Sequence, residues 1–206
     1  MSPPGPSRLS GSFWLIARPG GGRNLPFGQL GGSQAGQRIT YALDAARRVA
    51  LSARLSSPFR GNGREAALGI DWRPTRLPVH LLVEERLSLD GGAAQPAAQA
   101  IAGVTQRLPA RFRLDAYAQG GAVRRRGGFA DGAATVTRPL IDHVELGVGA
   151  WGAVQRGVAR VDVGPTLRVV APVGRVAVRL GLDYRLRIAG RARPGSGPAL
   201  SVGSSF

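Results

Sequence analysis

The two histidines are the side chains of this sequence best suited to act as a general base. A lipid-hydrolysing site would pair a histidine with a serine nucleophile. Neither His80 nor His143 has a serine two residues away, and the strands assigned below place both at the same end of the fold. We therefore expect neither histidine to be catalytic, and we expect the chain not to be an enzyme.

Paired carboxylates and metal ligands are also missing from the sequence. Glu84 and Glu85 are adjacent, so in a strand they point to opposite faces and cannot act together on one substrate. The glycine runs at 20–22 and 31–32 lack the strand-then-helix setting of a phosphate-binding loop, which indicates ordinary loops. The sequence has no cysteine, and its Asp, Glu and His residues show no metal-ligand spacing. We expect no metal site and no cofactor.

The charge balance is strongly basic, with 28 basic and 12 acidic side chains and a net charge of +16 over 206 residues. Every basic residue is arginine, and only Arg124 to Arg126 form a run. A basic domain can bind nucleic acid through its phosphates. Dispersed arginines equally suit solvated or lumenal faces. A soluble nucleic-acid-binding β-protein is therefore the less favoured alternative, and we expect no nucleic-acid partner.

Apolar and polar residues alternate with a period of two along the whole chain, whereas helical periodicity is nearly absent. Such segments occur at 9–18, 33–43, 47–57, 64–73, 78–88, 97–108, 111–122, 128–138, 143–155, 157–170, 173–188 and 197–206. The links after the even-numbered segments are tight, while most of the others are longer and rich in glycine or proline. This pattern is typical of an up-and-down meander.

Alternation also occurs in soluble β-sandwiches, so further features must decide between the two folds. Charged residues occupy mid-strand positions on the polar face, whereas the opposite face is nearly all aliphatic over about five positions, the height of a lipid-facing band. Tyr41, Trp72 and Phe112 fall on the apolar face near the tight turns, as half of an aromatic girdle. We predict an all-β fold, an up-and-down antiparallel transmembrane β-barrel of about twelve strands, with 1–206 as a single domain.

The chain ends inside its last strand, with Leu200, Val202 and Phe206 on one face. A final strand that closes on a C-terminal phenylalanine resembles the C-terminal strand of Gram-negative outer-membrane β-barrels. In that family the barrel-assembly machinery reads this strand. The resemblance implies that Leu200, Val202 and Phe206 form an assembly signal, that the protein resides in the outer membrane among its lipids, and that the assembly machinery is a partner.

A narrower resemblance covers most of the chain. The segments that carry it are GGSQAGQRITYALDAARRVALSARLSSP, ALGIDWRPTRLPVHLLVEER and GSGPALSVGSSF. They resemble the C-terminal barrels of proteins of the bacteriophage N4 adsorption protein A type and of TPR-containing exopolysaccharide-export proteins. The sequence shows neither a TPR segment nor a signal peptide, and its only Met is residue 1. We therefore expect the chain to be the C-terminal part of a longer protein.

The polar face defines the candidate functional site. By alternation, the charged residues that face the lumen are Arg48, Arg54, Asp71, Arg73, Glu84, Arg86, Arg113, Asp115, Arg160, Asp162, Arg168, Arg179, Asp183 and Arg185. They could form an electropositive channel for anionic solutes or an acidic polysaccharide. They could instead pair across the lumen and fill it. Because arginine outnumbers acid on this face, pairing cannot neutralise it, which favours an anion-attracting interior.

We therefore expect a non-enzymatic pore or export channel, with exopolysaccharide as a candidate cargo. A surface receptor or adsorption platform with a plugged lumen is the first alternative. In that case the long loops at 19–32 and 189–197 would bind the partner.

Overall fold

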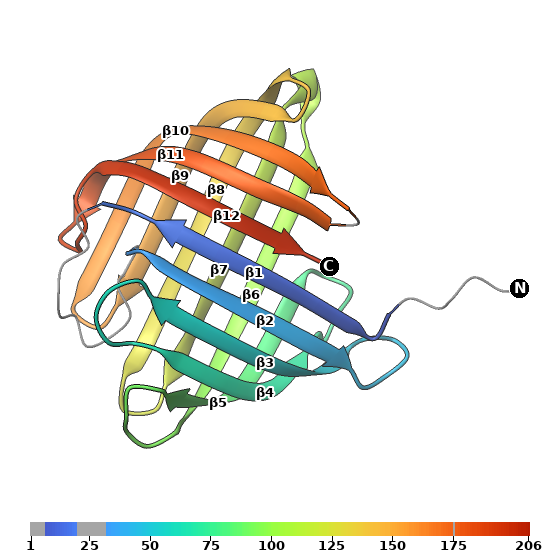
Figure 1. Ribbon diagram of the computed structural model, residues 1–206, viewed down its shortest axis with the longest axis vertical. Helices are drawn as coiled ribbons and strands as arrows, with labels where there is room; N and C mark the ends of the chain where they lie inside the picture. Colours follow the sequence, from blue (N-terminus) through green and yellow to red (C-terminus); the bar gives the residue numbers. More distant parts are fainter. Residues whose placement is uncertain (1–6, 20–31, 175) are drawn as a thin grey trace, which may run out of the picture.

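The computed structural model describes residues 7–19, 32–174 and 176–206, which form one closed antiparallel barrel (Figure 1). Its strands are β1 (Leu9–Ala17), β2 (Gln34–Ala42), β3 (Val49–Pro58), β4 (Glu65–Trp72), β5 (Val79–Ser88), β6 (Gln95–Arg107), β7 (Arg113–Val123), β8 (Gly127–Ile141), β9 (Val144–Gln155), β10 (Val158–Val173), β11 (Val176–Gly190) and β12 (Gly197–Ser205). Each strand pairs with its neighbour in sequence, and β1 pairs with β12 to close the sheet. The prediction of a twelve-stranded up-and-down barrel is confirmed.

The connections divide the barrel into two ends. In the described part of the chain, the short-turn end is formed by residues 43–48, 73–78, 108–112, 142–143 and 174, and the long-loop end by 18–19, 32–33, 59–64, 89–94, 124–126, 156–157 and 191–196. Strand β1 begins and β12 ends at the short-turn end (Figure 1). The predicted end of the eighth segment at residue 138 is wrong, because β8 continues to Ile141 and leaves a turn of only Asp142 and His143 before β9. The glycines at 20–22 and 31 lie outside the described residues.

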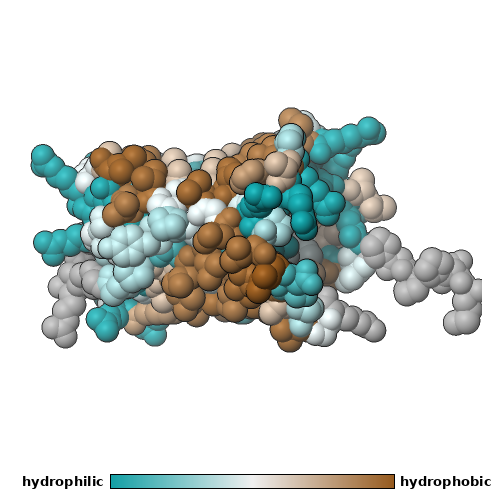
Figure 2. Space-filling model, turned by 90° about the horizontal axis from the view of Figure 1, so that it is seen from above, coloured by the Kyte–Doolittle hydropathy of each residue, from teal (hydrophilic) through white to brown (hydrophobic). Residues whose placement is uncertain are grey.

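The distribution of apolar side chains is the inverse of that in a soluble domain. Among the described residues, eight hydrophobic and thirteen polar or charged residues are buried. Large aliphatic side chains such as Leu68, Val83 and Val148 instead lie on the outside, with 64–69% of their surface exposed. Figure 2 shows one side of the barrel, where hydrophobic side chains gather in the middle and strongly hydrophilic ones project mainly at the two ends. An apolar belt of this kind suits contact with lipid.

Three aromatic residues of the outer face lie near the short-turn end, whereas Phe13 and Tyr184 lie farther along their strands. Tyr41 and Trp72 are the last or next-to-last residues of their strands, and Phe112 directly precedes β7. Their side chains are 46%, 48% and 39% exposed. Rings at this level of an apolar belt are suited to the interface between lipid tails and headgroups.

Phe206 completes the seam between the first and last strands. Its backbone N–H donates to the carbonyl of Gly11, and the Gly11 N–H donates to the carbonyl of Phe206, both at 2.9 Å. The phenyl ring lies directly over Gly11, where a Cβ atom would come within 2.3 Å of Cζ. The seam therefore needs a residue without a side chain opposite the terminal ring.

We expect the substitution Gly11→Ala to destabilise the barrel by at most about 1 kcal/mol, because the added methyl group displaces the Phe206 ring, the free end of an exposed side chain, from the seam. Gly203→Ala is the matched control, since a Cβ there meets Phe13 O at an ordinary 3.5 Å. The test is urea unfolding of the two variants refolded into vesicles. The folded fraction is measured by heat-modifiable gel mobility, and the urea midpoints are compared. Equal midpoints would contradict the role of Gly11.

Candidate functional site

The inner face of the barrel carries most of the charged side chains selected from the sequence. Arg54, Asp71, Glu84, Arg86, Arg113, Asp115, Arg160, Asp162, Arg168, Arg179, Asp183 and Arg185 lie in strands, and each lines the cavity or is buried in the wall beside it. Arg48 and Arg73 differ, because they lie in turns just outside β3 and β4. Asp44 Oδ1 accepts hydrogen bonds from the backbone N–H groups of Arg48 and Val49, both at 2.8 Å. These bonds hold Arg48 in the turn, so β3 begins only at Val49 and the Arg48 side chain is exposed.

The first ion network lies on β3, β4 and β5 and is centred on Glu84, which is 3% exposed. Its Oε1 accepts hydrogen bonds from Arg54 Nη2 at 3.0 Å and from Arg86 Nε at 2.7 Å. Arg54 also pairs with Glu65 at 2.6 Å, and Glu65 is reached by Arg126 from the link between β7 and β8 at 3.4 Å. Arg38 lies opposite Arg54 on the neighbouring strand, so a row of arginines crosses this wall.

The second network lies on β10 and β11 and is centred on Asp183, which is 1% exposed. Thr166 donates to its Oδ1 at 2.7 Å, and Arg168 and Arg185 pair with the same carboxylate at 3.2 and 2.9 Å. Arg185 also lies over the ring of Trp151, 4.4 Å from the centroid, in a cation–π contact. The carboxylate, two arginines and the indole therefore fix one another on this wall.

A third cluster holds the link between β11 and β12 against the inner wall. Asp162 pairs with Arg160 at 2.6 Å and with Arg18 at 3.3 Å. Arg160 then donates to the carbonyl of Pro194, and Arg18 to that of Gly195, each at 3.0 Å. Burial and the neighbouring Arg160 lower the pKa of Arg18 to about 10. These bonds draw part of the long-loop end toward the lumen.

At the short-turn end, polar side chains form smaller groups of ion pairs and hydrogen bonds. Arg113 pairs with Asp115 at 2.8 Å and with Glu145 at 3.7 Å. His80 Nδ1 lies 2.8 Å from Asp71 Oδ1. Within the described chain no hydrogen bond joins a serine to His80, and His143 is exposed in a turn. We see a polar pair at His80 and no nucleophile positioned against it.

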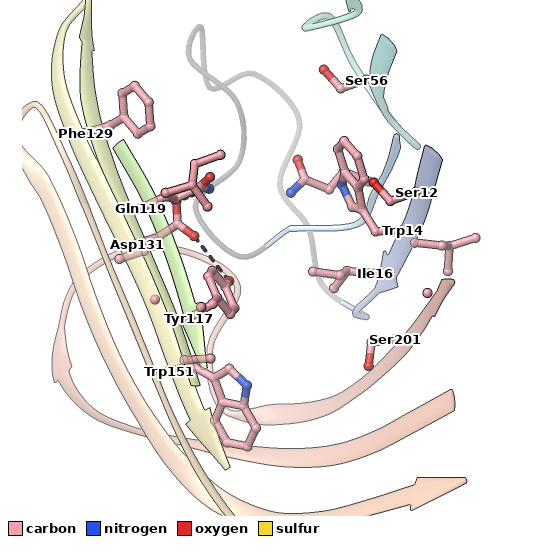
Figure 3. A pocket seen from close by; sticks show the side chains of 18 of the residues that line it. Ser12, Trp14, Ile16, Ser56, Tyr117, Gln119, Phe129, Asp131, Trp151 and Ser201 are labelled. Atoms are coloured by element: carbon pink, nitrogen blue, oxygen red, sulfur yellow. Dashed lines mark hydrogen bonds between the residues drawn. The ribbon is translucent and has the colours of Figure 1, made fainter. Parts of the chain in front are cut away.

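Asp131 on β8 has a different environment from the other carboxylates. Tyr117 Oη donates to its Oδ2 at 3.2 Å, and Gln119 Nε2 donates to its Oδ1 at 2.7 Å. Figure 3 shows these three side chains on one wall of the cavity, above Trp151 and across from Trp14. In the described part of the chain Asp131 forms no ion pair, which sets it apart from the charge networks.

The cavity between these walls has a volume of about 1340 Å³. Its lining reaches from Arg64 and Asp90 at the long-loop end to Arg113 and Arg179 at the short-turn end. Counted over the described residues, ten arginines and six carboxylates line it. No ion pair within 4 Å involves Arg38 or Arg179 in the described chain, although Glu84 and Asp71 lie near enough to Arg38 to interact with its charge. The cavity is therefore electropositive.

The sequence did not single out several of these residues. Trp14, Arg18, Arg38 and Glu65 were not selected, nor were Tyr117, Asp131, Glu145 and Trp151. A signal existed for Arg38, which alternates with Ile39 and Tyr41 in an expected strand. For Asp131 there was little signal, because its strand is rich in alanine and glycine and the two faces differ little in polarity.

The described residues contain no group of three or more His, Asp or Glu side chains that could hold a metal ion. In the same part of the chain, no helix is long and apolar enough to span a membrane.

Comparison with known proteins supports the fold and not a particular family. No family model and no curated protein matches the sequence. An outer-membrane channel from Pseudomonas putida F1 is similar in structure, with a TM-score of 0.50, 9% identity, and coverage of 100% of this chain and 98% of that one. LpxR from Salmonella typhimurium has a TM-score of 0.41 and 12% identity over 96% and 99% of the two chains. Wzi from Escherichia coli, a carbohydrate-binding barrel involved in capsule assembly, has a TM-score of 0.35 and 13% identity over 84% and 51%.

The Pseudomonas putida F1 channel is an outer-membrane protein, and the chain shares its class of fold. At such low identity the likeness is limited to the fold. It gives no specific support to the resemblance to phage-adsorption or TPR-containing export proteins, which stays a hypothesis.

Asp90 anchors the link between β5 and β6 to the link between β3 and β4, and its titration tests this contact. Its carboxylate accepts the backbone N–H groups of Gly63 and Arg64 and the Nε–H of Arg64. These bonds lower the pKa of Asp90 to about 2. The ordinary value is about 3.9, so the stabilisation is complete above about pH 4 and is lost as the pH falls through about 2.

We expect the carboxyl carbon of Asp90 to titrate with a midpoint near 2 in NMR spectra. In the variant Arg64→Gln the midpoint should rise, because the side-chain donor and its charge are removed. A midpoint at the ordinary value in the unmodified protein would show that this contact does not form.

Proposed function

We propose that this chain is a non-enzymatic pore or export channel of the Gram-negative outer membrane that passes anionic solutes. The observation that carries the proposal is an excess of arginine: among the described residues ten arginines and six carboxylates line the cavity. Arginine remains in excess when the buried Glu84 and Asp183, which pair with lining arginines, are counted as well. Fixed charge of one sign inside a narrow, low-dielectric wall raises the local concentration of ions of the opposite sign. Acidic exopolysaccharide, which the sequence resemblance suggests, is a candidate cargo of this charge.

The exterior supports placement in a membrane rather than in water. The outer face carries exposed leucine, isoleucine and valine side chains along the strands, with Tyr41 and Trp72 near the short-turn end. In outer-membrane barrels the short turns face the periplasm and the longer loops face outward. By this rule Leu200, Val202 and Phe206, in or just after the closing strand, would be presented to the assembly machinery, and outer-membrane lipid would surround the belt.

A surface receptor or adsorption platform with a closed lumen is the second candidate. The contacts of Arg18 and Arg160 with Gly195 and Pro194 favour it, since they hold the link between β11 and β12 toward the lumen. A soluble nucleic-acid-binding protein is a weaker candidate, because such a protein would not expose an aliphatic belt of this kind.

Tracer uptake into vesicles containing the purified barrel separates these candidates. Glucuronate, glucose and protonated glucosamine have similar rings and differ in charge. We expect uptake in the order glucuronate, glucose, glucosamine, with the differences shrinking at high salt because the lumenal charge is screened. Uptake of none of the three would support a closed platform, and faster uptake of glucosamine would overturn the proposal.

A further inference from the structure

The cavity contains a hollow whose chemistry differs from that of the arginine-rich walls around it. Tyr117 on β7 and Trp151 on β9 lie opposite Ala133 on β8, one on each side. Neighbouring strands are about 4.8 Å apart, so the Cα atoms of Tyr117 and Trp151 are about 10 Å apart. Only the methyl group of Ala133 lies between them on the inner face. Two aromatic side chains therefore border a shallow floor.

Asp131 lies two residues along β8 from Ala133 and closes one side of this hollow. The cross-strand neighbours of Asp131 are Gln119 on β7 and Ala153 on β9. The small side chain of Ala153 extends the shallow floor formed by Ala133. The carboxylate is held by the Tyr117 hydroxyl and the Gln119 amide at 3.2 and 2.7 Å. A carboxylate has about four acceptor positions, so two neutral donors leave acceptor capacity for further hydrogen bonds.

The Asp131 carboxylate also differs from the other five that line the cavity. Glu65, Asp90, Asp115, Glu145 and Asp162 each pair with an arginine. For Asp131 the described residues supply only uncharged donors. An unpaired carboxylate repels the acidic groups of an anionic solute. Its free acceptor positions can still receive hydrogen bonds from the uncharged hydroxyl groups of that solute.

Two aromatic faces are open to the cavity at this level. Tyr117 is 47% exposed although it points inward. Across the cavity, Trp14 lies flat against the wall over Gly36, where a Cβ would come within 2.3 Å of Cζ2. Figure 3 shows Trp14 facing the wall that carries Tyr117, Asp131 and Trp151. Flat aromatic faces provide apolar contact area with little loss of conformational entropy.

We infer that this hollow, bordered by Tyr117, Trp151, Gln119 and Asp131 and faced across the cavity by Trp14, binds a sugar ring of an acidic saccharide. The Tyr117 face contacts one C–H face of the ring, Trp14 faces its other side, and Asp131 and Gln119 bond its hydroxyl groups. That the saccharide is acidic rests on the proposed function, because the surrounding arginines attract acidic groups. The hollow itself recognises the ring and not the charge.

Two substitutions with the same charge change test the site. Asp131→Asn and Asp115→Asn each remove one lumenal carboxylate, so simple electrostatics predicts that both strengthen the binding of every anion. We expect Asp115→Asn to do so. Asp131→Asn should instead weaken the binding of oligomannuronate about tenfold, because the single amide oxygen that remains is a neutral, weaker acceptor than the carboxylate. The same substitution should strengthen the binding of an oligoglutamate of equal charge.

The measurement is isothermal titration of the refolded barrel in detergent with oligomannuronate, oligoglutamate and a maltooligosaccharide. Trp14→Leu and Tyr117→Leu should weaken both saccharides and leave oligoglutamate unchanged, whereas Trp72→Leu on the outer face should affect none of the three. The site is refuted if neither saccharide binds, or if Asp131→Asn strengthens oligomannuronate binding as Asp115→Asn does. If instead both saccharides bind equally and Asp115→Asn has no effect, the site stands and the anion-attracting lumen of the proposed function fails.

Discussion

Replacement of Asp183 by leucine is expected to cost about 3–5 kcal/mol of folding free energy. Asp183 is 1% exposed and receives a hydrogen bond from Thr166 and ion pairs from Arg168 and Arg185. Without the carboxylate, Arg185 remains in the wall at 7% exposure with its charge unpaired. Removing one partner of a buried pair leaves the desolvation penalty of the other, which makes the loss large.

Urea unfolding of the barrel in vesicles measures this change. Asp142→Asn is the control, because Asp142 is exposed in the turn between β8 and β9 and its loss should alter stability by less than about 0.5 kcal/mol. If Asp183→Leu fails to refold under any condition, Asp183→Asn should refold with an intermediate midpoint. Unchanged stability in both Asp183 variants would show that the carboxylate does not hold this wall together.

The double substitution Arg38→Glu with Arg179→Glu should reverse the ion preference of the lumen. A charge about 7 Å from the ion path contributes about 0.6 kcal/mol in water, and salt at about 0.1 M roughly halves this. Reversing a charge doubles this screened energy for each ion, and the anion and the cation change in opposite directions, so their energies separate by about 1.2 kcal/mol. Each substitution should therefore lower the anion-to-cation permeability ratio about sevenfold.

These two arginines are suitable targets because no carboxylate pairs with them within the described chain. A glutamate at position 38 would lie opposite Arg54, which can pair with it, so the variant is expected to fold. Arg76→Glu is the matched control for each single substitution, since Arg76 is exposed in the turn between β4 and β5 and does not line the cavity. An equal change in the control and in either single variant would assign the effect to net charge and not to the lumen.

The barrel could be predicted from the sequence because its main determinant is local. Alternation along each strand separates a lipid-facing from a lumenal face, and it does not depend on which strands are neighbours. Glu85 illustrates how far this holds. It is exposed on the outer face, and its place beside Pro96 near the long-loop end explains how a charge is tolerated there.

The partners across the lumen could not be predicted in the same way. Arg18 and Asp162 are 144 residues apart, and Arg126 and Glu65 are 61 apart, so their contacts exist only once the sheet has closed. Alternation also fails where both faces are apolar. In β1, Phe13 and Leu15 alternate with Trp14 and Ile16, and only the pairing of Trp14 with Gly36 shows which set points inward.

The reversal potential of single channels in a planar bilayer under a KCl gradient tests the central claim most directly. If the described arginines make the lumen electropositive, the reversal potential should lie toward the chloride equilibrium potential and move toward zero as the salt concentration rises. A reversal potential on the potassium side would contradict an anion-attracting channel. The absence of any conductance would favour the closed platform instead.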